Sequence, residues 1–301
     1  MINISSNYKY CYLSGINFLV LFLYLVFYVY ISLNTNNFVP DEIHFFEVSR
    51  EFFNNKHLNP DYFGTFFWFF LGIFPSLLFA KFIFLILFLF PFLFIWWKLF
   101  NQSKEASLFF ILIWISMPIS LWNGKIVGPE VLNYFIIFLT IYLVYKNYIF
   151  ISALLLGLAI GIKIDSLYVF VPYVYILFFN SDENFSNSFV KKLVKVFFII
   201  FFGYVLSNPF SWSSHILNVI TSKADAPFLL SKNLNRMLFS ERWTWDAISY
   251  TGFFNYFFNF FSFVVFLFLL NNNRKYLFFI FFSFLSACFF IIITEHFFIW
   301  Y

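Results

Sequence analysis

An acidic pair directly after a proline is the feature of this sequence best suited to chemistry. Asp41 and Glu42 follow Pro40 in the segment VPDEIHFFEVS, just beyond the first long apolar run. A carboxylate at the border between lipid and water can act as a general base, because its environment there can tune its pKa. A structural interpretation also fits: Asp41 caps a helix over 43–55, and Glu42 favours the positive helix end. The two interpretations are compatible, because a cap fixes the position of the carboxylate.

Two further pairs of opposite charge interrupt apolar segments. Lys125 and Glu130 stand in the short turn LWNGKIVGPEVL, and Lys163 and Asp165 separate two apolar runs in GLAIGIKIDSLYVF. A lysine at a span end can simply extend its charge toward water, and the second pair could cap two helices joined by a tight turn. Charges this close to lipid are costly unless they are paired or functional. Lys163 could also hold a phosphate at the membrane surface as a point charge.

Small residues and a proline predict how the neighbouring helices pack and end. Gly157 and Gly161 are four residues apart, a spacing that allows two helices to approach closely. Asn208-Pro209 predicts a helix end, because proline disfavours helical geometry in the residue before it.

The composition requires lipid around these elements. Hydrophobic residues make up 62% of the 301 residues and charged residues 11%, against roughly 45–50% and about 25% in soluble domains. We therefore expect an all-α, polytopic membrane domain over 1–301. Its expected spans are 16–33, 80–98, 106–121, 129–146, 149–163, 165–180, 194–209, 253–270 and 276–294. Gly72 and Pro75 interrupt the apolar segment 64–79, which we expect to be an interfacial or re-entrant piece.

The distribution of basic residues predicts the orientation of the chain. With the N-terminus in the cytoplasm, the inner segments carry most of their charge as Lys or Arg and form a net positive side. The outer segments hold most of the acids and are net negative. The inner basic residues are Lys9, Lys98, Lys104, Lys146, Lys191, Lys192, Lys195, Arg274 and Lys275.

Two hydrophilic segments, 34–63 and 210–252, then face outward and are too long to be simple connections. In the first, phenylalanines recur at three- and four-residue spacing after Glu42, which predicts an amphipathic helix lying in the interface. The sequence contains no phosphate loop, dinucleotide fingerprint or metalloprotease motif. Its four histidines show no ligand spacing, so we expect no metal site and no cofactor.

The order of these motifs resembles the GT-C superfamily of membrane glycosyltransferases, over about 16–212. The similarity is closest to the protein O-mannosyltransferase and aminoarabinose-transferase branch, and GLAIGIK is its most specific element. The segment VPDEIHFFEVS also resembles the acidic loop of the mannosyltransferases that build lipid-linked oligosaccharides and GPI anchors. Members of the superfamily transfer a sugar from a polyprenyl-phosphate-linked donor to an acceptor at the outer or lumenal membrane face. The resemblance implies the same activity, and the GT-C fold, for this chain.

The resemblance also implies roles for single residues. Asp41 would be the catalytic base or the carboxylate that orients the acceptor, with Glu42 beside it. Lys125 and Glu130 stand where the family usually places an arginine and an acidic residue, so Lys125 departs from the pattern. Lys163 would approach the donor phosphate. The further substrate-binding residues that we expect are His44, Asp165 and Arg242.

The expected partners follow from the same resemblance. They are a polyprenyl-phosphate sugar, a glycan, lipid or protein acceptor, and the bilayer, with no nucleic acid and with a divalent cation as an optional addition. The composition favours a bacterial cell (inner) membrane, with the active site on the outer face. The chain ends where many members continue with further spans and a soluble domain, so we expect a fragment or a minimal form.

Two other functional classes, and a membrane scaffold without catalysis, remain as alternatives. A flippase or transporter for a lipid-linked glycan would place its charges near the midplane, in two related halves. An O-antigen-type polymerase or ligase would concentrate Arg and His in a large late outer loop. Here the charges gather on one face, and the segment 210–252 is only moderately basic.

Overall fold

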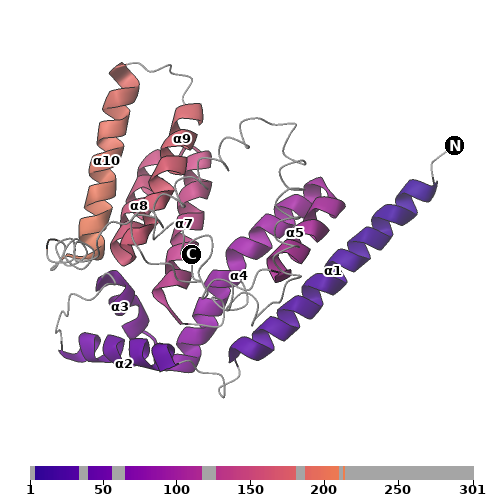
Figure 1. Ribbon diagram of the computed structural model, residues 1–301, viewed down its shortest axis with the longest axis horizontal. Helices are drawn as coiled ribbons and strands as arrows, with labels where there is room; N and C mark the ends of the chain where they lie inside the picture. Colours follow the sequence, from indigo (N-terminus) through magenta and orange to yellow (C-terminus); the bar gives the residue numbers. More distant parts are fainter. Residues whose placement is uncertain are drawn as a thin grey trace, which may run out of the picture.

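The computed structural model describes residues 4–33, 40–55, 65–116, 127–180 and 187–209, together with Ser213. All regular structure in these ranges is helical, which confirms the all-α prediction for this part of the chain. The expected spans 253–270 and 276–294 and the segment 210–252 lie outside the described residues. The helices are α1 (Ile4–Leu33), α2 (Pro40–Asn55), α3 (Thr65–Gly72), α4 (Leu77–Gln102), α5 (Lys104–Ser116), α7 (Pro129–Tyr145), α8 (Ile149–Ile162), the 3₁₀-helix η2 (Ile164–Val169), α9 (Phe170–Asn180) and α10 (Asn187–Ser207) (Figure 1).

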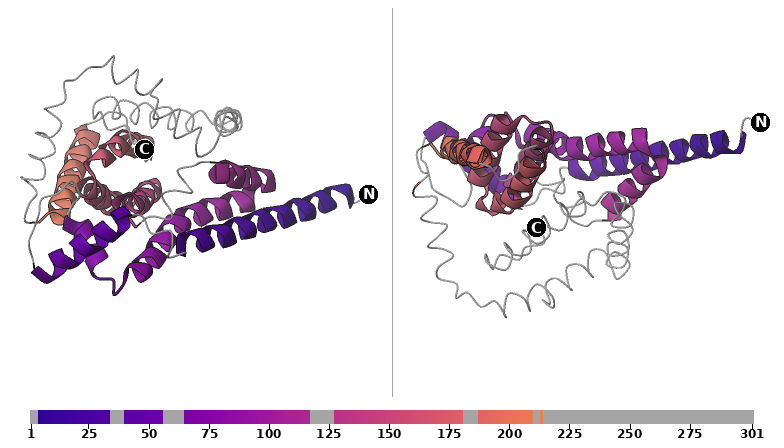
Figure 2. Two further views of the ribbon diagram at one scale, coloured as in Figure 1. Left: turned by 60° about the horizontal axis from the view of Figure 1, so that its bottom comes forward. Right: turned by 90° about the horizontal axis from the view of Figure 1, so that it is seen from above.

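Ring contacts fix the relative directions of α1 and α4. Tyr24 meets Phe92 at 5.4 Å between ring centroids, and Phe18 meets Phe100 at 5.1 Å. Later residues of α1 therefore contact earlier residues of α4, and the two helices are antiparallel. The N-terminal part of α1 projects beyond the other helices (Figure 2).

The same kind of contact shows that α4 and α7 run in parallel. Phe88 meets Tyr134 at 5.7 Å, and Phe94 meets Tyr142 at 5.1 Å. After α7 the chain reverses at Asn147, whose φ of 64° is a left-handed conformation that asparagine tolerates. The next helix, α8, returns along α7.

Glycines let α8 and α10 pack closely, as the spacing of Gly157 and Gly161 predicts. A methyl group added at Gly157 would overlap the carbonyl oxygen of Ile200, and one at Gly161 would overlap the hydroxyl of Ser207. Gly203 on α10 lies against α8 in the same way. The order of these contacts makes α8 and α10 parallel.

These directions bring many helix termini to one end of the molecule, which we call the polar end. Here α4, α7 and η2 begin, and α1, α5, α8 and α10 end. Two short helices, α2 and α3, pack against each other at this end, and α3 also contacts α8 and α10 (Figure 1).

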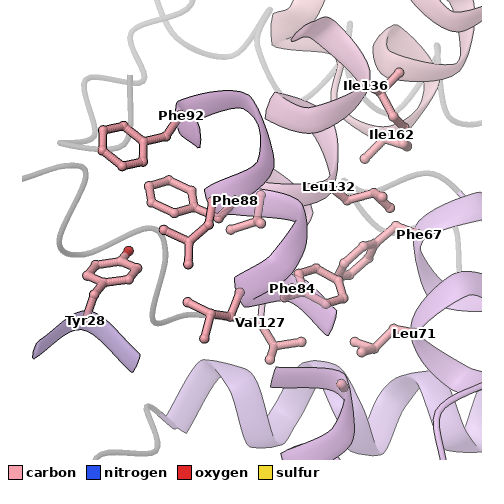
Figure 3. Packing of buried hydrophobic residues seen from close by; sticks show 14 of the residues in the cluster. Tyr28, Phe67, Leu71, Phe84, Phe88, Phe92, Val127, Leu132, Ile136 and Ile162 are labelled. Carbon is pink, nitrogen blue, oxygen red and sulfur yellow. The ribbon is translucent and has the colours of Figure 1, made fainter. Parts of the chain in front are cut away.

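The amphipathic pattern predicted after Glu42 is present in α2. Phe45, Phe46 and Phe52 pack against the main hydrophobic cluster, whereas Glu47 and Glu51 are exposed. The cluster itself combines aromatic residues of α1, α3 and α4 with aliphatic residues such as Leu132 and Ile136 of α7 (Figure 3). Because α3 contributes to this cluster and α2 packs against it, both helices are held on a close-packed interior.

Two of the described helices are long and apolar enough to cross a bilayer. They are α1, over Cys11–Tyr30, and α4, over Leu77–Gln102. The 26 residues of α4 give a length of about 39 Å at 1.5 Å per residue, more than the roughly 30 Å of a hydrocarbon core. Large apolar side chains are exposed along one helix after another, for example Phe22 and Phe27 on α1 and Phe198 and Phe202 on α10.

Two boundaries differ from the sequence predictions. The helix expected over 43–55 begins at Pro40, so Asp41 lies in its first turn and is not the cap. Proline suits the first helical position because it lacks an N–H that would have no partner there. The expected span 165–180 divides into η2 and α9, and Pro172 then falls in the first turn of α9, where it is tolerated. The segment 64–79 is interrupted as expected, between α3 and the N-cap of α4 at Ser76.

Candidate functional site

A buried ion pair joins the acidic motif to α4. The carboxylate of Glu42 lies 3.0 Å from Nζ of Lys81, and the two side chains are 0% and 2% exposed. The other oxygen, Oε1, accepts a hydrogen bond of 2.8 Å from the backbone N–H of Val127, just before α7. One carboxylate thus connects α2, α4 and the start of α7.

A second ion pair lies in the first turn of α7, at Glu130, three residues after Val127. Nζ of Lys163 lies 2.8 Å from Oε1 of Glu130, with the side chains 14% and 26% exposed. Glu130 is in the first turn of α7 and Lys163 is the C-cap residue of α8. This pair is therefore accessible from the polar end, unlike the pair of Glu42 and Lys81.

A hydrogen-bonded pair of neutral side chains, Asn133 and Ser166, joins α7 to η2 next to this ion pair. Asn133 stands three residues after Glu130, and Ser166 stands three residues after Lys163. Nδ2 of Asn133 donates to Oγ of Ser166, and both residues are buried. Oδ1 of Asn133 has no hydrogen-bond partner among the described residues, so this deeper pair leaves one buried polar atom unsatisfied.

Asn208 connects three elements at the polar end. Its Nδ2 donates to the carbonyl oxygen of Gly161 at 3.0 Å, and its Oδ1 accepts from the N–H of Thr65 at 3.0 Å. Asn208 is 1% exposed. The residue before Pro209, predicted only to end a helix, therefore also joins α10 to α8 and α3.

The structure brings some of the predicted site residues together and leaves others apart. Glu42, Glu130 and Lys163 lie around the start of α7, each in an ion pair. His44 is exposed on α2. The backbone places Asp41 in the first turn of α2 and Asp165 in η2. Lys125 and Arg242 lie outside the described residues.

The structure gives two of the lysines partners that the sequence interpretation did not name. Lys163 is paired with Glu130, an acid 33 residues earlier, whereas the side chain of Asp165 lies outside the described part of the structure. Lys81, to which the sequence interpretation gave no role, is the partner of Glu42. The sequence does contain a signal that Lys81 has an anionic partner, because a lysine among the apolar residues of a helix is costly without one. The choice of partner depends on tertiary packing.

The described residues hold no group of three or more His, Cys, Asp or Glu side chains that could bind a metal ion. Their polar end offers instead carboxylates, two lysines and amide groups, which suit hydrogen bonding and the binding of an anionic group. No family model, curated protein or solved structure matches the chain in the three comparisons.

Proposed function

We propose that this chain is a membrane glycosyltransferase of the GT-C type. It spans the bilayer about nine times and moves a sugar from a polyprenyl-phosphate-linked donor to an acceptor at the outer face. This assigns the polar end to the outer side and the basic turns at the other end to the cytoplasm, as the positive-inside rule requires.

One observation supports this proposal above the others. Three motifs far apart in the sequence, PDE, GPE and GIK, lie at the same end of the helices. Glu42 and Lys163 both bond to the segment 127–130, Glu42 to the N–H of Val127 and Lys163 to the carboxylate of Glu130. A transferase that takes its donor from the bilayer needs a carboxylate and a cation on one face, close to the lipid. The partly exposed pair of Glu130 and Lys163 supplies a cation that an arriving phosphate can attract.

In the proposed reaction, the Asp41 carboxylate accepts the proton of an acceptor hydroxyl or amine. The acceptor atom forms a bond to the anomeric carbon of the sugar, and the bond from that carbon to the phosphate oxygen breaks. The electron pair of the broken bond leaves with the polyprenyl phosphate. Lys163 stabilises the negative charge that grows on this leaving group. No nucleotide or redox group takes part.

Sugar transfer by membranes that contain the chain tests the proposal. Labelled polyprenyl-phosphate hexoses and pentoses are supplied one at a time, with membranes that lack the chain as the control. Label that reaches a glycan, lipid or protein only when the chain is present is the expected result. If the label crosses the bilayer on its lipid without reaching an acceptor, the chain is a flippase and the proposal is wrong.

A further inference from the structure

Lys81 is a buried cation to which the proposed reaction gives no role. It lies in an apolar stretch of α4 and is 2% exposed. A lysine this far from water is strongly destabilising unless an anion and further hydrogen bonds compensate its charge. The anion that compensates the charge of Lys81 is the carboxylate of Glu42.

Glu42 is poorly suited to react with a substrate. It is 0% exposed, one oxygen faces Lys81, and the other accepts from the N–H of Val127. A general base must come within hydrogen-bond reach of the proton that it removes. The two contacts instead attach the first turn of α2 to α4 and to the segment before α7.

A second contact holds the other half of α2. The guanidinium of Arg50 donates to the carbonyl oxygen of Pro75 at 2.7 Å, in an exposed position. Pro75 lies just before α4, six residues from Lys81. The helix α2 is thus fixed to the beginning of α4 twice, by a buried ion pair near its N-terminus and by an exposed hydrogen bond further along.

We propose that Lys81 and Glu42 are positioning residues that hold the neighbouring Asp41 in place for catalysis, an inference that rests on the proposed function for its catalytic part. Asp41 and Glu42 are adjacent in the first turn of one helix, so a fixed Glu42 fixes the backbone of Asp41. A displacement of about 1 Å at a reacting group can lower a rate roughly 100-fold. The expectation from the resemblance that Glu42 shares in catalysis beside Asp41 is replaced by an indirect role.

Hydrogen–deuterium exchange tests the attachment without any assay of activity. The variant Lys81→Met removes the cation and keeps much of the side-chain volume. Backbone exchange over 41–46 and at Val127 is expected to rise at least 10-fold, while exchange in α8 and α10 stays unchanged. The matched control is Lys98→Met, which removes an exposed lysine near the other end of the same helix and is expected to change neither region.

Steady-state transfer kinetics test the positioning role. Lys81→Met is expected to lower kcat at least 10-fold with a smaller effect on the KM of the donor. The double variant Glu42→Gln/Lys81→Met removes both charges and retains an oxygen that accepts from Val127. It is expected to recover transfer to within about five-fold of the wild type, and it also covers the case in which the single variant does not fold.

The outcomes separate the two proposals. If exchange over 41–46 stays at the wild-type level in Lys81→Met, the attachment is wrong. If the double variant is well folded and as inactive as Asp41→Asn, Glu42 itself reacts and the positioning role is wrong. If wild-type chain transfers no sugar but the exchange result holds, the proposed function and the catalytic part of this inference both fail, and only the attachment of α2 stands.

Discussion

Of the two ion pairs described at the polar end, that of Lys163 with Glu130 is the more exposed. Under the proposed function, Lys163→Met weakens attraction of the donor phosphate. We expect the KM of the donor to rise about 10-fold, with a smaller change in kcat. Because the two side chains are only 14% and 26% exposed, the substitution is also expected to lower the free energy of unfolding by about 1–3 kcal/mol, since Glu130 loses its charged partner.

Lys146→Met is the matched control, since Lys146 is exposed at the opposite end of α7. Initial rates measured over a range of donor concentrations check both variants. Equal donor KM values in Lys163→Met and wild type would remove Lys163 from the donor site.

Asn208 provides a stability test at the polar end. Asn208→Ala leaves the carbonyl oxygen of Gly161 and the N–H of Thr65 without this buried partner. The expected loss is about 1–3 kcal/mol in the free energy of unfolding. Denaturant titration in detergent measures it, with Asn147→Gly, at an exposed left-handed position, as a variant that should change stability by far less. A loss no larger than that of Asn147→Gly would mean that these hydrogen bonds contribute little.

At the level of elements, the close packing of α8 against α10 depends on glycine. Gly157→Ala would force the two helices apart, because the new methyl group meets the backbone of Ile200. Overpacking of this kind costs about 1–3 kcal/mol, and sometimes more when the obstacle is backbone. Gly15→Ala is the control, because nothing lies within 4 Å of the added group and the helix gains propensity there. Thermal unfolding midpoints should fall for Gly157→Ala alone; equal midpoints would contradict the account of this interface.

The elements also show what a sequence can and cannot predict. The spacing of Gly157 and Gly161 is local and predicted a close helix contact correctly. It could not name α10 as the partner, because that choice depends on packing between distant segments. Likewise, the acids of the PDE motif are plain in the sequence. The burial of Glu42 against Lys81 is set by how α2 lies on α4, which no local pattern encodes.

At the scale of the whole molecule, the directions of the helices place His44 and Lys146 at opposite ends. Both are exposed. With Cys11 and Cys288 replaced by serine, single cysteines at these two positions test the proposed orientation. A membrane-impermeant maleimide added to intact cells is expected to label His44→Cys at once and Lys146→Cys only after permeabilisation. Labelling of Lys146→Cys from outside would show that the orientation is inverted.

The central claim is that the polar end transfers sugar with Asp41 as its base, and one comparison tests it most directly. Purified membranes with the wild-type chain or with Asp41→Asn receive the same labelled polyprenyl-phosphate sugar. The substitution keeps the size of the side chain and removes its ability to accept a proton. We predict transfer by the wild type and a loss of at least 1,000-fold in the variant, as expected when both general-base catalysis and orientation of the acceptor are lost. Equal transfer by both proteins would contradict the assignment of Asp41.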